Sequence, residues 1–229
     1  HTPVPAGHDK FSEQLVEKIL PQDKLEILEF TGELNMTELA LENSSYCNAV
    51  SDRHAEVSRD MFPGYDIDAV TNGVHSSTWS IEPFSKLFDE NIPRWRVDPA
   101  RLTKVAGIND NEIWQAKKEA KKRLSEHLEE YEGEELDLET FTVGFARRST
   151  SYKRPTLIFR DLDRLESLAD EYGGLQLVFG GKAHPDDVRG KELVSQILKY
   201  SEMLEKVDVY FIEDYSMEDA LEMVSGVDL

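Results

Sequence analysis

Residues 141–229 alternate between short apolar runs and longer amphipathic stretches. The apolar runs are FTVGFARR, LQLVFGG and VDVYFIED, and each precedes a stretch in which apolar residues recur at helical spacing. A run such as Leu175 to Phe179, apolar at almost every position, is typical of a strand covered on both faces. The order strand then helix, met three times, predicts an α/β fold with a doubly wound parallel sheet.

The starts of the helices can be placed from the residues that favour them. In the sheet region, helices are expected to begin at Pro155, at about Asp186 and at Ser216. Proline suits the first turn of a helix, and a stripe of apolar residues follows Pro155. Upstream, apolar residues at helical spacing predict one long amphipathic helix over residues 110–131.

The N-terminal part has a different pattern. Residues 31–62 show helical spacing with an interruption at the sequence NSS, which predicts a mainly helical N-terminal segment. Residues 63–98 are rich in proline, glycine and aromatic residues, and we expect an irregular connection there.

Three loops follow the predicted strands, at residues 146–153, 180–184 and 213–216. Ligands of doubly wound sheets bind beyond the carboxyl ends of the strands, and in a parallel sheet these ends meet at one edge. The three loops are therefore the place where binding chemistry is expected.

The composition limits the partners of the chain. With 39% apolar residues among 229, the chain can bury a core, and 46 acidic against 26 basic residues give a net charge of −20. Such a negative field repels nucleic acids and anionic membranes, so neither is an expected partner. Any phosphate-binding site must therefore be local.

Cysteine and histidine usage narrows the classes further. Cys47 is the single cysteine, which excludes an intrachain disulfide, and the six histidines show no metal-ligand spacing, so no metal is predicted. No apolar run approaches the roughly 20 residues of a membrane span. The N-terminus lacks the features of a signal peptide, and we expect a cytoplasmic protein. The absence of an initiating methionine and the stop after a helical pattern suggest a fragment.

The segment ARRSTSYKRP holds four cations and no acid. Arg147, Arg148, Lys153 and Arg154 directly follow the first predicted strand. Arginine offers a planar fork that fits phosphate oxygens and lysine a compact charge, so the cluster suits a phosphate-type dianion. The alternative is that these cations only offset the acidic surface, and the sequence leaves both interpretations open.

Other candidate groups are less specific. The turn FGGKAHP places Gly180 and Gly181 after a strand, where they permit a close backbone approach or simply form a tight turn. Neither a GxGxxG fingerprint nor a GxxxxGK[ST] phosphate loop occurs. Asn72 lies in a turn sequence and has an amide suited to sugar hydroxyls, whereas Trp79 suits either a stacking wall or the core.

In their order along the chain, several segments resemble those of the α-glucan phosphorylases, the family of glycogen, starch and maltodextrin phosphorylases. The shorter bacterial and archaeal branch is the most similar. The segments are HTPVPAGHD at 1–9, NMTELALENSSYCNAVSDRHAEVS at 35–58, TNGVHSSTW at 71–79, GFARRSTSYKRPTL at 144–157, FGGKAHP at 179–185 and VYFIEDYSMEDA at 209–220. The resemblance runs from end to end of the chain but covers only the middle of a family member.

The resemblance implies a set of ligands and residue roles. Family enzymes use pyridoxal 5'-phosphate (PLP), inorganic phosphate and an α-1,4-glucan, and release α-glucose 1-phosphate with retained configuration. The matched positions are Arg148 and Lys153, catalytic at the substrate phosphate, Arg147, Trp79 and Tyr215 at the cofactor, and His1, Asn72 and Tyr152 at the glucose. Arg147 falls where the family commonly has lysine, so the charge is kept.

The chain also departs from the family pattern. Ser216 stands where animal enzymes carry arginine, and Ala49 replaces a glycine. The family's cofactor lysine belongs to a Gly-, Ser- and Thr-rich block that nothing here matches, so we expect it outside this chain. The resemblance implies the end of the N-terminal domain at 1–72 and the first half of a Rossmann-like C-terminal domain at 73–229, in a two-domain glycosyltransferase-like fold.

These observations predict that the parent protein is a PLP-dependent α-glucan phosphorylase. Its partners would be the glucan and inorganic phosphate, and a homo-oligomer is compatible with the resemblance. A nucleotide-sugar glycosyltransferase is the alternative enzyme, since it shares the architecture and needs cations for a diphosphate. A non-catalytic module that binds glucan or phosphate is the alternative for the chain by itself.

Overall fold

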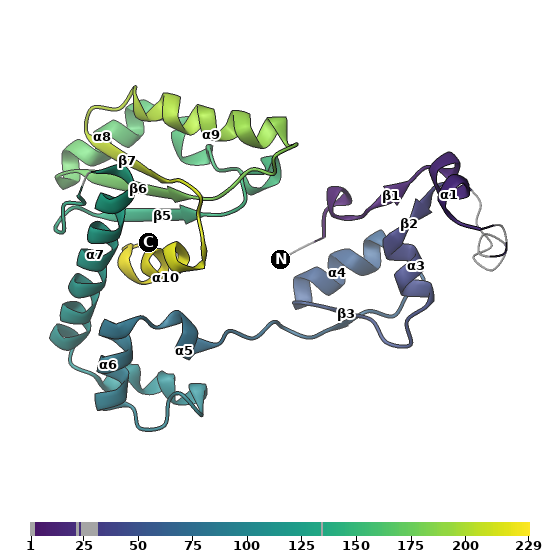
Figure 1. Cartoon of the computed structure of the whole chain (residues 1–229). Coiled ribbons are helices and arrows are strands. Elements are labelled where there is room, and N and C mark those ends of the chain that lie inside the picture. Colours follow the sequence, from purple (N-terminus) through teal and green to yellow (C-terminus); the bar gives the residue numbers. More distant parts are fainter. Residues whose placement is uncertain (1–2, 22, 24–31, 134) are drawn as a thin grey trace. The chain divides into compact units, whose positions relative to one another are not determined.

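The computed structural model describes every residue except 1–2, 22, 24–31 and 134 (Figure 1). The chain divides into two compact units, His1–Val74 and His75–Leu229, which we call the N-terminal unit and the C-terminal unit. The sequence predicted a boundary after residue 72. The assignment of the two parts to domains of a longer protein stays a prediction.

Short elements make up the described part of the N-terminal unit. In chain order they are a 3-10 turn at Pro5–Gly7, β1 Lys10–Phe11, α1 Glu13–Ile19, β2 Leu34–Asn35, α3 Met36–Glu42, β3 Asn48–Ala49, α4 Asp52–Met61 and β4 Asp68–Ala69. β1 pairs with β2 antiparallel and β3 with β4 parallel. Residue 31 lies outside the described residues, but the helices predicted over 31–62 are present as α3 and α4, with β3 after the NSS interruption.

Residues 63–98 are not the irregular connection that their composition predicted. They contain α5, Ser76–Trp79, and α6, Glu82–Asn91. Proline and aromatic residues favour loops in general, but Pro83 stands in the first turn of α6, where a helix needs no backbone donor. Leu87 of α6 packs with the buried Trp95 in a small core, and this burial favours the helix.

The long helix predicted over 110–131 is confirmed as α7, Asp110–Glu132. A 3-10 helix at Pro99–Gly107 precedes it. The side chain of Asn109 accepts a hydrogen bond from the backbone N–H of Asn111 at 2.9 Å, which explains where α7 begins. No helix in the described ranges is both long and apolar enough to cross a membrane.

The C-terminal unit contains the predicted parallel sheet. Its strands are β5, Thr142–Ala146, β6, Leu175–Gly180, and β7, Val207–Ile212, in the order β5-β6-β7. The helices after them are α8, Leu162–Tyr172, α9, Val188–Ser201, and α10, Met217–Gly226. Both neighbouring pairs are parallel.

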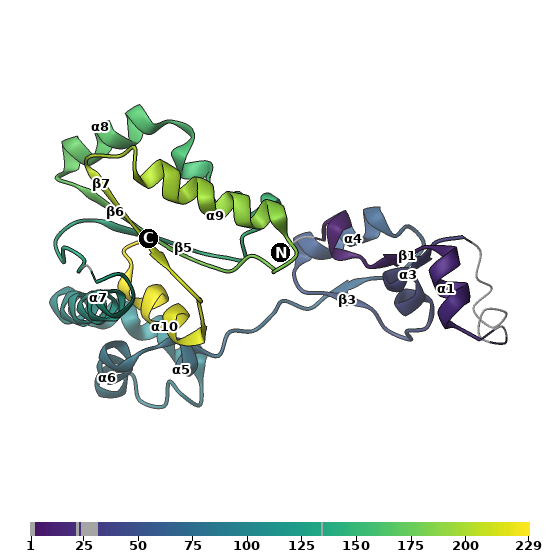
Figure 2. The same ribbon diagram turned by 45° about the horizontal axis from the view of Figure 1, so that its top comes forward.

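Helices cover both faces of this sheet, as the apolar runs predicted (Figures 1 and 2). On one face, Val178 of β6 packs in a core with residues of α7 and α10, including Leu124 and Met223. On the other face, Leu177 and Phe179 pack in a second core with residues of α8 and α9. The α/β fold with a doubly wound parallel sheet is therefore confirmed.

The first helix after β5 begins later than predicted. Pro155 does not start it; single 3-10 turns occupy Ser151–Lys153 and Leu157–Arg160, and α8 starts at Leu162. The reason is local, because the side chain of Asp161 accepts a hydrogen bond from the N–H of Arg164 at 3.0 Å and so caps α8.

The last residues of the chain run along the edge of β5 that faces away from β6. The N–H of Gly144 donates to the carbonyl of Leu229 at 2.8 Å, and the N–H of Asp228 donates to that of Thr142 at 2.8 Å. The carboxylate of Asp228 accepts from Lys121 of α7 at 2.9 Å and from the N–H of Thr142 at 2.9 Å. A nearly buried ion pair thus ties α7 to this edge.

Candidate functional site

The loops after β5 and β6 are joined beyond the ends of the strands. The N–H of Arg147 donates to the carbonyl of Gly180 at 3.0 Å, and the N–H of Ser149 donates to that of Lys182 at 3.1 Å. The pairing of the two strands therefore continues into their loops. As a result, the segment with the four cations lies beside FGGKAHP at the carboxyl edge of the sheet.

The two glycines of that turn make room for atoms of this chain. Gly181 has a φ of +149°, and a Cβ atom there would lie 2.0 Å from the carbonyl oxygen of Arg147. A Cβ on Gly180 would lie 2.6 Å from the ring of Tyr215, in the loop after β7. Of the two interpretations that the sequence left open at these glycines, the structure has the close approach, and neighbouring loops make it.

The four cations after β5 have no acidic partner among the residues that the structure describes. Within the described residues, no ion pair joins Arg147, Arg148, Lys153 or Arg154 to an aspartate or glutamate, although basic residues in both units form such pairs. Cations that only offset the acidic surface would each lie near an acid. A cluster of unpaired positive charges instead attracts an anion.

Lys153 and Arg154 share a cavity. Both line a space of about 350 Å³ whose walls also come from the apolar residues of β5, β6 and the 3-10 turn after Pro155. The Lys153 ammonium lies 4.8 Å from the centre of the Tyr152 ring, a cation–π contact. Gly180 and Gly181 are not in the lining of this cavity. The side chains of Arg147 and Arg148 are exposed.

Helix α9 braces the cation segment, which the sequence did not predict. The Nε of Arg189 donates to the Ser151 hydroxyl at 2.9 Å. A Cβ at Gly190 would lie 2.4 Å from the Ser149 carbonyl, so this glycine lets α9 touch the segment. The buried Thr150 hydroxyl has no hydrogen-bond partner in the described part of the chain. A glycine inside a helical pattern was the available signal for this contact.

The loop after β7 closes the edge of the sheet. Asp214 pairs with Lys182 through Oδ1 and Nζ at 2.6 Å, and Tyr215 packs on Gly180. Burial raises the pKa of the Tyr215 hydroxyl, and the negative charge of Asp219 raises it further. The hydroxyl of Tyr215 is therefore a neutral donor around pH 7.

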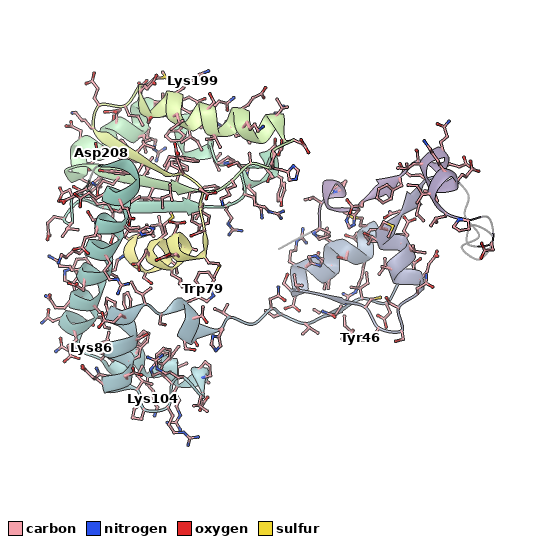
Figure 3. The ribbon with its side chains drawn as sticks, viewed as in Figure 1. Tyr46, Trp79, Lys86, Lys104, Lys199 and Asp208 are labelled. Atoms are coloured by element: carbon pink, nitrogen blue, oxygen red, sulfur yellow. The ribbon has the colours of Figure 1, made fainter. Side chains whose placement is uncertain are left out.

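Trp79 is not part of this cluster. Trp79 of α5 lies beside α10 (Figure 3) and lines a separate space of about 290 Å³, in which none of the other predicted site residues of the C-terminal unit takes part. Asn72 belongs to the N-terminal unit and is exposed, with its backbone N–H bonded to the carbonyl of Val50 at 3.1 Å. His1 lies outside the described residues. Over those residues, no three His, Cys, Asp or Glu side chains gather as a metal site would require.

Known proteins match the chain over nearly its whole length. The family model described as "Carbohydrate phosphorylase" matches residues 7–229. A maltodextrin phosphorylase of Thermococcus litoralis is 38% identical over an alignment that covers 100% of this chain and 32% of that relative. Glycogen phosphorylases of Aquifex aeolicus and Mycobacterium tuberculosis are 36% and 30% identical, with 85% and 100% of this chain covered. The chain spans about a third of the length of these relatives.

Proposed function

Because this chain belongs to the carbohydrate phosphorylase family, we propose that the protein of which it forms a part catalyses the phosphorolysis of α-1,4-glucans. In this reaction the bond between C1 of the terminal glucose and the neighbouring 4-oxygen breaks. An oxygen of inorganic phosphate forms the new bond to C1 with retained configuration, and a proton passes to the freed 4-oxygen. The products are α-glucose 1-phosphate and a glucan shorter by one unit.

The observation that carries this proposal is the unpaired cation cluster at the carboxyl edge of the sheet. Arg148 and Lys153 would bind the substrate phosphate, and their charge would stabilise negative charge that develops on it in the transition state. No ion pair with a described acid competes for these two side chains. The braces from α9 and the 180–184 loop fix the backbone that carries them, so little reorganisation is needed when the anion binds.

The residues present also fit the phosphate group of PLP. Cations without an acidic partner and the buried Thr150 hydroxyl, which has no hydrogen-bond partner either among the described residues, would supply donors for a second phosphate beside the first. When bound, PLP supplies a phosphate that exchanges a proton with the substrate phosphate. Arg147 would hold that phosphate, and Tyr215 and Trp79 would pack around the cofactor. The lysine that attaches PLP is proposed to lie outside these residues.

The glucose would be bound by polar side chains. Tyr152, 48% exposed next to Lys153, can reach a sugar hydroxyl. His1 and Asn72 would contact the 6-hydroxyl of the glucose, a role that rests on the family resemblance. The acceptor and donor capacity of an amide and an imidazole suits a hydroxyl group.

Charge reversal at the cluster tests this function. In the protein that carries this chain, Lys153→Glu should lower the release of glucose 1-phosphate from maltodextrin and phosphate by about a hundredfold or more, the scale seen when a transition-state donor is lost. Lys104→Glu, the same change at an exposed lysine of the 3-10 helix before α7, should leave the rate unchanged. Near-normal activity of Lys153→Glu would falsify the role of this lysine.

The same assay separates the alternatives. Glucosyl transfer from a nucleotide-sugar donor without any need for phosphate would indicate a glycosyltransferase. Turnover by the 229-residue chain alone would exclude the non-catalytic binding module, which is the alternative for the chain by itself.

A further inference from the structure

The loop after β7 is anchored from α7, a helix that lies outside the strand-end edge. Nε2 of His127 on α7 lies 2.6 Å from Oδ1 of Asp219, in the first turn of α10. The other carboxylate oxygen, Oδ2, accepts from the backbone N–H of Ser216 at 2.5 Å. The Ser216 hydroxyl in turn accepts from the N–H of Asp219, which completes a capping box. Asp219 thus connects α7 to the last residue of the 213–216 loop.

The carboxylate of Asp219 depends on these partners. Asp219 is 1% exposed. Burial alone would raise the pKa of its carboxyl group, but the hydrogen bonds from Ser216 and His127 hold the pKa below the ordinary value of 3.8. A buried carboxylate is stable only while both oxygens are bonded. Loss of His127 would therefore weaken the hold of Asp219 on the loop.

The anchored loop makes two contacts with the loop after β6. The Asp214 carboxylate pairs with Lys182, and the Tyr215 ring lies on Gly180. Gly180 and Lys182 are also the residues whose carbonyls accept hydrogen bonds from the backbone N–H groups of Arg147 and Ser149. A continuous series of contacts therefore runs from His127 to the cation segment.

We propose that His127 is a positioning residue for the anion site at the carboxyl edge of the sheet. Through Asp219 it holds the 213–216 loop against Gly180 and Lys182. The backbone of the cation segment, which is hydrogen-bonded to these two residues, is thereby kept in its anion-binding arrangement. His127 does not touch the anion itself. This proposal rests on the proposed function, because that function assigns the anion to this edge.

Two changes at His127 and one matched control test the proposal. His127→Leu removes the donor, whereas His127→Gln keeps an N–H group at similar reach. Arg123→Gln is the control, since Arg123 also joins α7 to α10, through Glu222 at 2.8 Å, but away from the loop. Each variant is titrated with inorganic phosphate in a calorimeter, and its urea midpoint is measured.

We expect His127→Leu to bind phosphate about tenfold more weakly, the scale of one hydrogen bond to a charged group. His127→Gln should restore most of the affinity, and Arg123→Gln should lower the urea midpoint without weakening phosphate binding. Unchanged affinity in His127→Leu, or an equal loss in Arg123→Gln, would overturn the proposal. If His127→Leu does not fold, His127→Asn is measured instead. The asparagine side chain is polar, but it is too short for its amide to reach Asp219.

The phosphate titration also distinguishes an error in the proposed anion site from an error in the role of His127. If the wild-type chain itself binds no phosphate, the anion site is wrong and the role of His127 falls with it. If the wild-type chain binds phosphate and His127→Leu binds it equally well, only the role of His127 is wrong.

Discussion

Single residues at the end of β6 show what a sequence pattern can and cannot predict. Two adjacent glycines after an apolar strand permit either a close approach to the backbone or a simple tight turn, and the structure has a close approach at both. The partners, the Arg147 carbonyl and the Tyr215 ring, come from two other loops. Only the packing of the three strands decides which atoms arrive there. The same holds for Arg189 and Gly190, which brace the cation segment from α9.

Substitution of Gly181 tests the contact between the loops after β5 and β6. In Gly181→Ala the new Cβ would meet the Arg147 carbonyl at 2.0 Å, and the φ of +149° is strained for alanine. We expect a loss of about 3 kcal/mol in the free energy of unfolding, measured with urea. Gly107→Ala, with nothing near its Cβ, should change it by less than about 0.5 kcal/mol. Equal effects of the two changes would contradict the close contact between these loops.

At the level of elements, strong periodicity was sufficient, and the helix start predicted at Ser216 is confirmed by the capping box of α10, whereas the cap of α8 was not foreseen. The three strands and α7 follow directly from apolar spacing. The predicted start of α8 at Pro155 was wrong. Proline favours the first turn of a helix in general, but Asp161 forms the cap of α8. Helix α6 was missed because its proline and aromatic residues are typical of a loop, and its packing against α7 cannot be seen in the sequence.

The cap of α8 can be tested with two neighbouring aspartates. Asp161→Ala removes the hydrogen bond to the N–H of Arg164 and should cost about 1 kcal/mol of unfolding free energy. Asp163→Ala removes only a charge from the first turn and should cost a few tenths of a kcal/mol, roughly the contribution of one exposed charge near a helix end. Urea unfolding of both variants measures the difference. A larger loss in Asp163→Ala would place the helix start elsewhere.

For the molecule as a whole, the fold class follows from apolar runs that need cover on both faces, whereas the grouping of the site residues does not. The sequence assigned Arg148, Lys153 and Tyr215 to strand-end loops, and they lie on such loops. Trp79 lines its own cavity at the other end of α10, because α5 packs near Val224 and Ser225. That placement depends on α5, a helix within the stretch expected to be irregular.

The stability of the C-terminal unit should fall at low pH. Burial alone would raise the pKa of Asp228, but bonds from Lys121 and the N–H of Thr142 hold it below its ordinary 3.8. A carboxyl group with a lowered folded pKa stabilises the fold fully above its unfolded pKa, and this contribution is lost as the pH falls through the folded value.

We therefore expect Asp228→Asn to lose about 3 kcal/mol at pH 7, since Lys121 is left without its buried partner, and to show a flatter decline of stability below pH 3.8. The control is Asp186→Asn, in an exposed loop, which should follow the wild type. Urea unfolding at a series of pH values gives both curves. Parallel curves for Asp228→Asn and the wild type would contradict the role of the Asp228 carboxylate.

The central claim is that the unpaired cations at the carboxyl edge of the sheet bind phosphate. The most direct measurement is a titration of the isotopically labelled chain with inorganic phosphate, followed by the backbone amide signals in NMR spectra. We expect saturable shifts concentrated at residues 147–153 and 180–182, which disappear in Lys153→Glu. Shifts spread over the other basic residues of the surface, or no saturable shift at residues 147–153, would contradict it.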